Sequence, residues 1–175
     1  MIISKDKLNS NSVSLAGEFA VLSQLALRGF DANMTLGHTK GVDILASNSR
    51  TGKMFKIEVK TSYDRKPSRS KLFGYTLSWI MAQKHENVID KELYFCFVNI
   101  ERTSNSFRFF IVPNDVVSEY VERQHNFWQE RDGGTHPHIE TKMRNFRIGL
   151  SWEQSEYTIN TPLSSKYENS WELLT

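Results

Sequence analysis

Three carboxylates and one lysine are the residues of this sequence whose types could perform chemistry together: Glu18, Asp43, Glu58 and Lys60. Carboxylate oxygens are hard ligands that suit Mg²⁺ or Mn²⁺. A cation held by Glu18, Asp43 and Glu58 lowers the pKa of a bound water, and a nearby lysine adds positive charge beside a scissile phosphate. The set predicts metal-assisted hydrolysis of phosphodiester bonds, with all four residues catalytic.

Two strands joined by a turn must position three of these residues. The segments VDILAS (42–47) and MFKIEVKT (54–61) are typical of strands, and NSRTGK between them of a hairpin turn. Side chains alternate between the faces of a strand, so Glu58 and Lys60 are neighbours about 6.6 Å apart. Antiparallel pairing across the turn can place Asp43 opposite Glu58, depending on the register.

A helix over residues 12–29 carries the fourth residue. Ser12 or Ser14 could cap its start, and Gly29 could end it. At about 100° per residue, Glu18 falls inside an apolar arc that we expect to face the core. That arc contains Leu15, Phe19, Leu22, Leu25 and Ala26. A carboxylate there is costly unless Lys60 or a divalent cation neutralises it.

The remaining segments indicate a mixed sheet with helices on its faces. Strands are predicted at 30–36, 93–100 and 107–113, and helices at 79–89 and 114–131. Residues 1–125 form the expected core, and 126–175 an extension packed on it within a single domain. In the helix 79–89, Gln83 and Lys84 are additional candidates to reach the site.

The pattern GVDILA…IEVKT, preceded by GEFAVLSQLALRGF and followed by FRFFIVPNDVV, resembles the PD-(D/E)XK (restriction-endonuclease-like) nuclease superfamily. A glutamate on the preceding helix is similar to the archaeal Holliday-junction resolvases, and the chain also looks like uncharacterised bacterial and phage relatives. The resemblance implies an αβββαβ core, with Asp43 and Glu58 as metal ligands, Lys60 as the catalytic lysine and Glu18 as the acid from the helix. It also allows a homodimer.

The same pattern departs from the superfamily in two respects. The proline of the motif name is absent, since KGVD stands there, and no Q-x-x-x-Y helper follows. Each charged residue taken alone has an ordinary structural interpretation. Glu58 and Lys60 could form the solvated face of an edge strand, Asp43 could cap a turn, and Glu18 could pair with a structural cation.

Basic residues follow the second strand in KTSYDRKPSRSK and indicate contacts with the phosphates of DNA. The expected nucleic-acid-binding residues are Lys40, Arg65, Lys66, Arg69 and Lys71. A solvated basic loop is the structural alternative. The segment KMRNFRIG (142–149) forms a further basic patch with an interleaved aromatic residue, and nothing in the sequence predicts a zinc site or a helix-turn-helix.

Composition limits the class of protein without choosing the function. The 175 residues are 39% hydrophobic and 24% charged, with a net charge of +2. The one cysteine, Cys96, excludes an internal disulfide, and no apolar run is long enough to span a membrane. We therefore expect a soluble cytoplasmic protein. The converging charges and the resemblance above make a DNA endonuclease the expected function, in DNA repair, recombination or phage defence. The alternative is a non-catalytic nucleic-acid-binding or assembly module that retains the nuclease fold.

Overall fold

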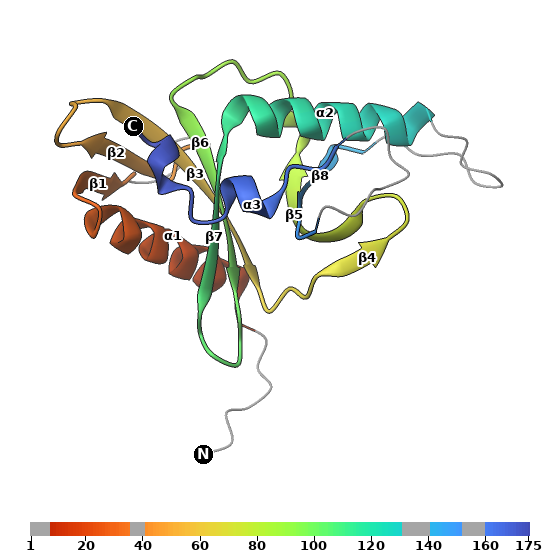
Figure 1. The fold of residues 1–175 in the computed structure, drawn as a ribbon, viewed down its shortest axis with the longest axis horizontal. Coiled ribbons are helices and arrows are strands. Elements are labelled where there is room, and N and C mark those ends of the chain that lie inside the picture. Colours follow the sequence, from red (N-terminus) through yellow and green to blue (C-terminus); the bar gives the residue numbers. More distant parts are fainter. Residues whose placement is uncertain (1–7, 36–40, 131–140, 152–159) are drawn as a thin grey trace.

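A computed structural model describes residues 8–35, 41–130, 141–151 and 160–175 of the chain (Figure 1). The elements in chain order are α1 (Ser10–Ala26), β1 (Phe30–Met34), β2 (Ile44–Asn48), β3 (Met54–Tyr63), β4 (Ser68–Ser70), β5 (Gly74–Ala82), the 3-10 turn η1 (Gln83–His85), β6 (Leu93–Ile100), β7 (Phe107–Pro113), α2 (Asn114–Glu130), β8 (Met143–Gly149), α3 (Ser164–Tyr167) and the 3-10 turn η2 (Trp171–Leu173).

A mixed five-stranded sheet forms the centre of the molecule, in the order β1-β2-β3-β6-β7. Only β3 and β6 pair in parallel, and the other neighbours pair antiparallel. Helix α1 packs against β1 and β3, and α2 contacts β6 and β7. The sequence-based prediction of a mixed α/β fold with helices flanking a central sheet is therefore confirmed.

Strands β6 and β7 are buried on both faces, which explains why their sequences are almost continuously apolar. On β6, Phe95 and Phe97 belong to the core beneath α2, whereas Cys96 and Val98 belong to the core beneath α1. Both cores therefore meet at the same two strands. The parallel pair of strands β3 and β6 lies where the two cores meet. The candidate residues Glu58 and Lys60 are on β3, at this junction.

The prediction of a helix over residues 79–89 is wrong. Residues 74–82 form strand β5, which pairs with β4 and β8 in a second, three-stranded sheet (Figure 1). Leu77, Trp79 and Met81 are buried, while Ile80 between them is 61% exposed. That period of two is typical of a strand with one buried face. The connection from β3 to β6 thus contains strands and a 3-10 turn where the αβββαβ pattern has its second helix.

Helix α1 buries a different face from the one predicted. Gly17, Val21 and Leu25 are buried, whereas Leu15 is 44% and Phe19 53% exposed. The angular positions of the apolar residues were compatible with two faces, and packing against β3 selected the one that contains the glycine. The cap also differs, because Asn9 accepts a hydrogen bond from the Asn11 amide at the helix start.

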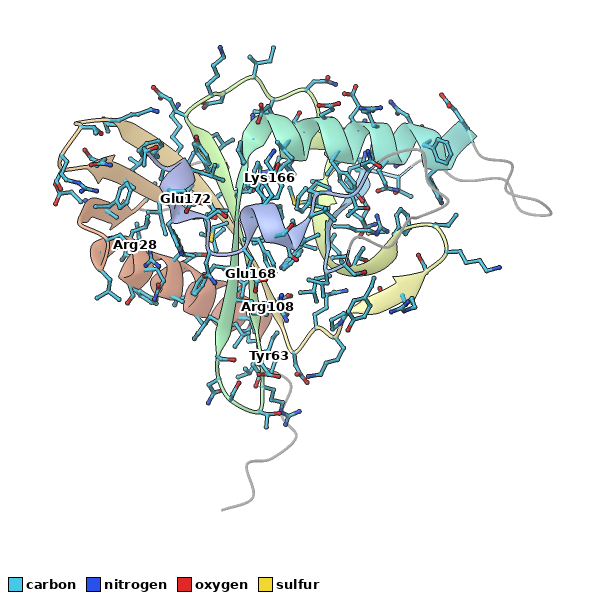
Figure 2. All side chains as sticks on the ribbon, in the orientation of Figure 1. Arg28, Tyr63, Arg108, Lys166, Glu168 and Glu172 are labelled. Atoms are coloured by element: carbon cyan, nitrogen blue, oxygen red, sulfur yellow. The ribbon has the colours of Figure 1, made fainter. Side chains whose placement is uncertain are left out.

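The C-terminal segment packs on the rest of the chain. The boundary expected at residues 125/126 lies within α2, and β8 pairs with β5 along its whole length. Arg108 of β7 makes a bidentate pair with Glu168, at 2.7 and 2.9 Å, and the two side chains lie together in Figure 2. None of the described helices is both long and apolar enough to cross a membrane.

Candidate active site

The register of the β2–β3 hairpin places Asp43 opposite Glu58. Ile44 pairs with Ile57, so the next residues outward are these two acids. The backbone N–H of Asp43 donates to the Ile57 carbonyl at 2.9 Å. Its carboxylate oxygen Oδ2 accepts from the Val59 N–H at 2.7 Å. Asp43 is thus held by backbone groups on both sides of Glu58.

Glu58 is a buried carboxylate, 3% exposed, with two cationic or polar partners. Its Oε1 accepts from Lys60 Nζ at 2.5 Å and from His85 Nε2 at 3.0 Å. Burial by itself would raise the pKa of Glu58, but the His85 hydrogen bond and the Lys60 charge lower it to about 2. The carboxylate is therefore ionised at neutral pH although it is out of water.

His85 is the residue of this site that the sequence reasoning missed. It belongs to η1, is buried, and packs edge-on against the ring of Phe95. The turn is held in place by a second buried pair, because Arg144 of β8 forms an ion pair with Glu86. The sequence does contain a signal for its position. Residues 74–82 alternate with the period of two of a strand, and a strand ending at Ala82 leaves His85 in the turn that follows it.

Asp43 and Glu18 both have raised pKa values. For Asp43 the main cause is burial, which the Val59 hydrogen bond and the charge of Lys60 offset only in part. For Glu18 the causes are burial and then the negative charge of Asp43, opposed by Lys60. Like charges held this close favour an added cation, which would relieve the repulsion.

Two glycines allow close approaches around these acids. At Gly17, an added Cβ would lie 2.9 Å from both Cβ and Cγ2 of Thr61, so α1 is seated directly on β3 next to Glu18. Gly41 has a φ of +79°, and a Cβ there would lie 3.3 Å from Oε2 of Glu58. The glycine of KGVD therefore leaves space at the second oxygen of this carboxylate.

Glu18 and Glu58 approach Asp43 from different elements. Helix α1 packs on the face of β3 that carries Val59, whereas Glu58 is on the other face with His85. Within the described ranges, no three His, Cys, Asp or Glu side chains form a group ready to hold a metal ion. Asp43 lies between the two other acids, because its charge interacts with that of Glu18 and with that of Glu58.

The predicted nucleic-acid-binding residues occupy several environments. Lys40 lies outside the described residues. Lys66 is exposed and pairs with Asp64 at 2.8 Å. Arg69 lies over the ring of Tyr75, with 5.4 Å between guanidinium carbon and ring centroid.

The remaining basic residues lie near β3, β4 and η1. Arg65 and Lys71 are exposed. Lys84 is exposed in η1, and its charge is close enough to lower the pKa of Asp43. Gln83 is exposed beside it.

A cavity of about 220 Å³ adjoins the site, and Lys60 is among the residues that line it. Residues 60–63 and Arg65 line it from β3 and the following loop, and Trp79 and Ile80 line it from β5. Two cationic side chains, Lys60 and Arg65, thus border one hollow.

Comparison with solved structures shows that the chain has a nuclease-like α/β fold. A similar structure is that of a bacterial homing endonuclease, I-Ssp6803I, which matches with a TM-score of 0.54 over 96% of this chain and 92% of the other, at 15% sequence identity. A likeness at this identity concerns the fold alone. No protein-family model and no curated protein matches the chain.

Proposed function

We propose that this protein is a metal-dependent endonuclease that hydrolyses phosphodiester bonds of DNA. The observation that carries the proposal is the ionised, buried Glu58, joined to Lys60 and lying opposite Asp43. Burial of such a carboxylate is costly for folding, and its position next to a lysine and a second acid is what this reaction requires. The nuclease-like fold of the homing endonuclease supports the same conclusion.

The donor set fits Mg²⁺ or Mn²⁺. Mg²⁺ is commonly held by one or two protein carboxylates, with waters and substrate phosphates completing its shell. Asp43 and Glu58 would be those carboxylates, and Glu18 would complete the acidic set from α1. Asp43 Oδ1 and Glu58 Oε2 accept no hydrogen bond from any residue that the structure describes. When bound, the cation would activate a water and offset the charge that develops on the phosphate.

The protein's own side chains supply the remaining functions. Lys60 can orient the attacking water and place positive charge beside the phosphate, since its ammonium is held by Glu58 and its side chain is 27% exposed. His85 does not face the substrate but fixes the position of Glu58, so we assign it as a positioning residue. Arg65, which lines the same cavity as Lys60, would contact an adjacent phosphate. Lys40, Lys66, Arg69 and Lys71 would contact further phosphates along the DNA strand.

The test is cleavage of linear and branched DNA with Mg²⁺ or Mn²⁺. Asp43→Asn and Lys60→Ala should each lose at least about 10²-fold in rate, the scale of a lost electrostatic contribution. Arg123→Gln is the matched control, because Arg123 is exposed on α2 and pairs only with Glu119 among the described residues. Equal cleavage by wild type and both site variants would refute the proposal.

The second candidate is a non-catalytic nucleic-acid-binding module with the same fold. It is favoured by the lack of a three-ligand group in the described part of the chain, and by the ion pair that already engages Glu58. Titration with Mn²⁺ discriminates the two functions. A nuclease site should bind Mn²⁺ and lose that binding in Asp43→Asn, whereas the module should bind DNA without any such metal site. The homodimer stays a prediction.

A further inference from the structure

One face of the second sheet is mainly polar and partly exposed, and it reaches the cavity beside the candidate active site. Pairing of β4, β5 and β8 puts the buried Thr76 and the exposed Met143 on this side. The same side carries Ser68, Ser70, Ser78, Ile80, Asn145 and Arg147. We call this set the open face. The opposite side carries Trp79 and Phe146 and is covered by the core beneath α2. Ile80 is 61% exposed, so this part of the open face is accessible.

The charge of the second sheet suits a polyanion. Strands β4, β5 and β8 contain three arginines and no aspartate or glutamate. The structure separates the arginines of the segment 142–149: Arg144 is buried and paired with Glu86, whereas Arg147 belongs to the open face. Only the second of these is therefore a candidate for contact with a partner.

Arg147 is held in one orientation but has unused hydrogen-bonding capacity. Its guanidinium carbon lies 3.7 Å from the ring centroid of Phe73, a stacked arrangement that fixes the plane of the fork. Its Nη1 is buried and has no acceptor among the described residues. No carboxylate in the part of the chain that the structure describes pairs with Arg147. Because Nη1 is shielded, an external acceptor such as a phosphate or a base edge would have to bind the other nitrogens of this pre-oriented guanidinium, Nε and Nη2.

The open face is continuous with the candidate active site. Ile80 belongs both to this face and to the cavity that Lys60 and Arg65 border. Ile80 pairs with Asn145, and Ser78 pairs with Arg147. A nucleic acid whose phosphate lies at Lys60 would therefore extend directly over these two residue pairs.

We propose that the open face lies in the major groove of a DNA duplex and reads its bases, with Arg147 on a guanine and Asn145 on an adenine. This inference rests on the proposed function for the position of the scissile phosphate. The major groove, about 12 Å wide, admits a two-stranded ribbon, and arginine and asparagine make bidentate pairs with guanine and adenine there. Ile80 is placed to contact a thymine methyl group.

The spacing of the two reading residues makes the proposal specific. Asn145 and Arg147 are two residues apart on one strand, which is about 6.6 Å. Two base-pair steps span about 6.8 Å at 3.4 Å per step. If β8 follows the groove, the guanine and the adenine are separated by two steps. Duplex RNA should not be read in this way, because its major groove is too deep and narrow for side chains.

The experiment is selection of a randomised DNA duplex library in EDTA, so that binding is measured without cleavage. Wild type should enrich a guanine and an adenine two steps apart. Arg147→Gln should lose the guanine preference by roughly 5- to 150-fold, and Asn145→Ala should lose only the adenine preference. Arg123→Gln, which removes the same charge from α2, should keep both. Asn145→Ala also provides the test if Arg147→Gln does not fold.

Several outcomes would overturn this inference. An unselective wild type would refute base reading, as would a duplex RNA of the selected sequence that binds equally well. If Arg147→Gln weakened binding equally for all DNA sequences, and the slope of log affinity against log salt concentration fell by about 1, the residue would contact a phosphate instead. Failure of the nuclease proposal is seen separately, in the cleavage assay of Lys60→Ala, because that residue is outside the open face.

Discussion

The contact between α1 and β3 at Gly17 gives the most direct test of how the candidate site is held together. In Gly17→Ala the new Cβ would lie 2.9 Å from Cβ and Cγ2 of Thr61 and closer still to its Oγ1. Carbon atoms pack at about 3.5–4.0 Å, so α1 must withdraw from β3 by about 1 Å. Because Thr61 Cβ is fixed to the backbone of β3, a change of rotamer cannot remove the clash.

The expected loss can be worked from two opposing effects. Overpacking at a contact of this kind costs about 3 kcal/mol, at the upper end of its usual range. Replacing a glycine in a helix interior by alanine contributes about 1 kcal/mol in the other direction. The net expectation for Gly17→Ala is a fall of about 2 kcal/mol in the free energy of unfolding.

Urea unfolding followed by circular dichroism measures this loss, and a double-mutant cycle assigns it. Thr61→Ala removes Oγ1 and Cγ2 but not Cβ, so the double variant should recover at least about 1 kcal/mol relative to additivity. Ser14→Ala, at an exposed position of α1, is the control and should change stability by less than about 0.5 kcal/mol.

Two results would refute the reasoning about Gly17. The first is a Gly17→Ala variant more stable than wild type by about 1 kcal/mol, as expected for a glycine in open space. The second is strict additivity in the cycle with Thr61. If the reasoning holds, DNA cleavage should also fall, by up to about 10²-fold, because Glu18 moves with the helix by about 1 Å.

Two further predictions concern the buried charges around Glu58. His85→Phe, in EDTA, should lower stability by about 1.5–3 kcal/mol at pH 7 and raise the pKa of Glu58 from about 2 toward its ordinary value of 4.5. The lowered pKa stabilises the fold above pH 4.5 and this contribution disappears as pH falls toward 2, so the difference from wild type should shrink on acidification. A difference that stays constant between pH 7 and 3.5 would assign the effect to packing. Arg144→Met should cost about 3–5 kcal/mol in urea unfolding, because Glu86 is left as an unpaired, mostly buried carboxylate. Glu86→Gln in the same chain should recover much of that loss, and no recovery would mean that the ion pair is not the cause.

The resemblance of the motif to a nuclease family and the likeness of the fold to a homing endonuclease were obtained from different observations. The first came from charged residues within strand-like segments, and the second from the path of the whole chain. Both lead to a nuclease-like fold. The activity itself and the metal are proposals that the experiments above decide, and the homodimer stays a prediction.

The sequence by itself determined the strands and helices with strong local patterns. Alternation in MFKIEVKT assigned Glu58 and Lys60 to one face of β3, and the length of the turn made the pairing of β2 and β3 antiparallel. The apolar runs of β6 and β7, and the helix that follows Pro113, were also predictable. In each case the deciding interactions lie within a few residues along the chain.

Only the tertiary structure decided which surfaces became buried and which residues met. The apolar residues of α1 suited two faces, and the close approach of Gly17 to Thr61 selected one. Residues 79–82 became strand because β8, over 60 residues later, supplied hydrogen bonds and a core to pack on. The same pairing brought His85 to Glu58. Such contacts depend on long-range geometry, which no local pattern in the sequence contains.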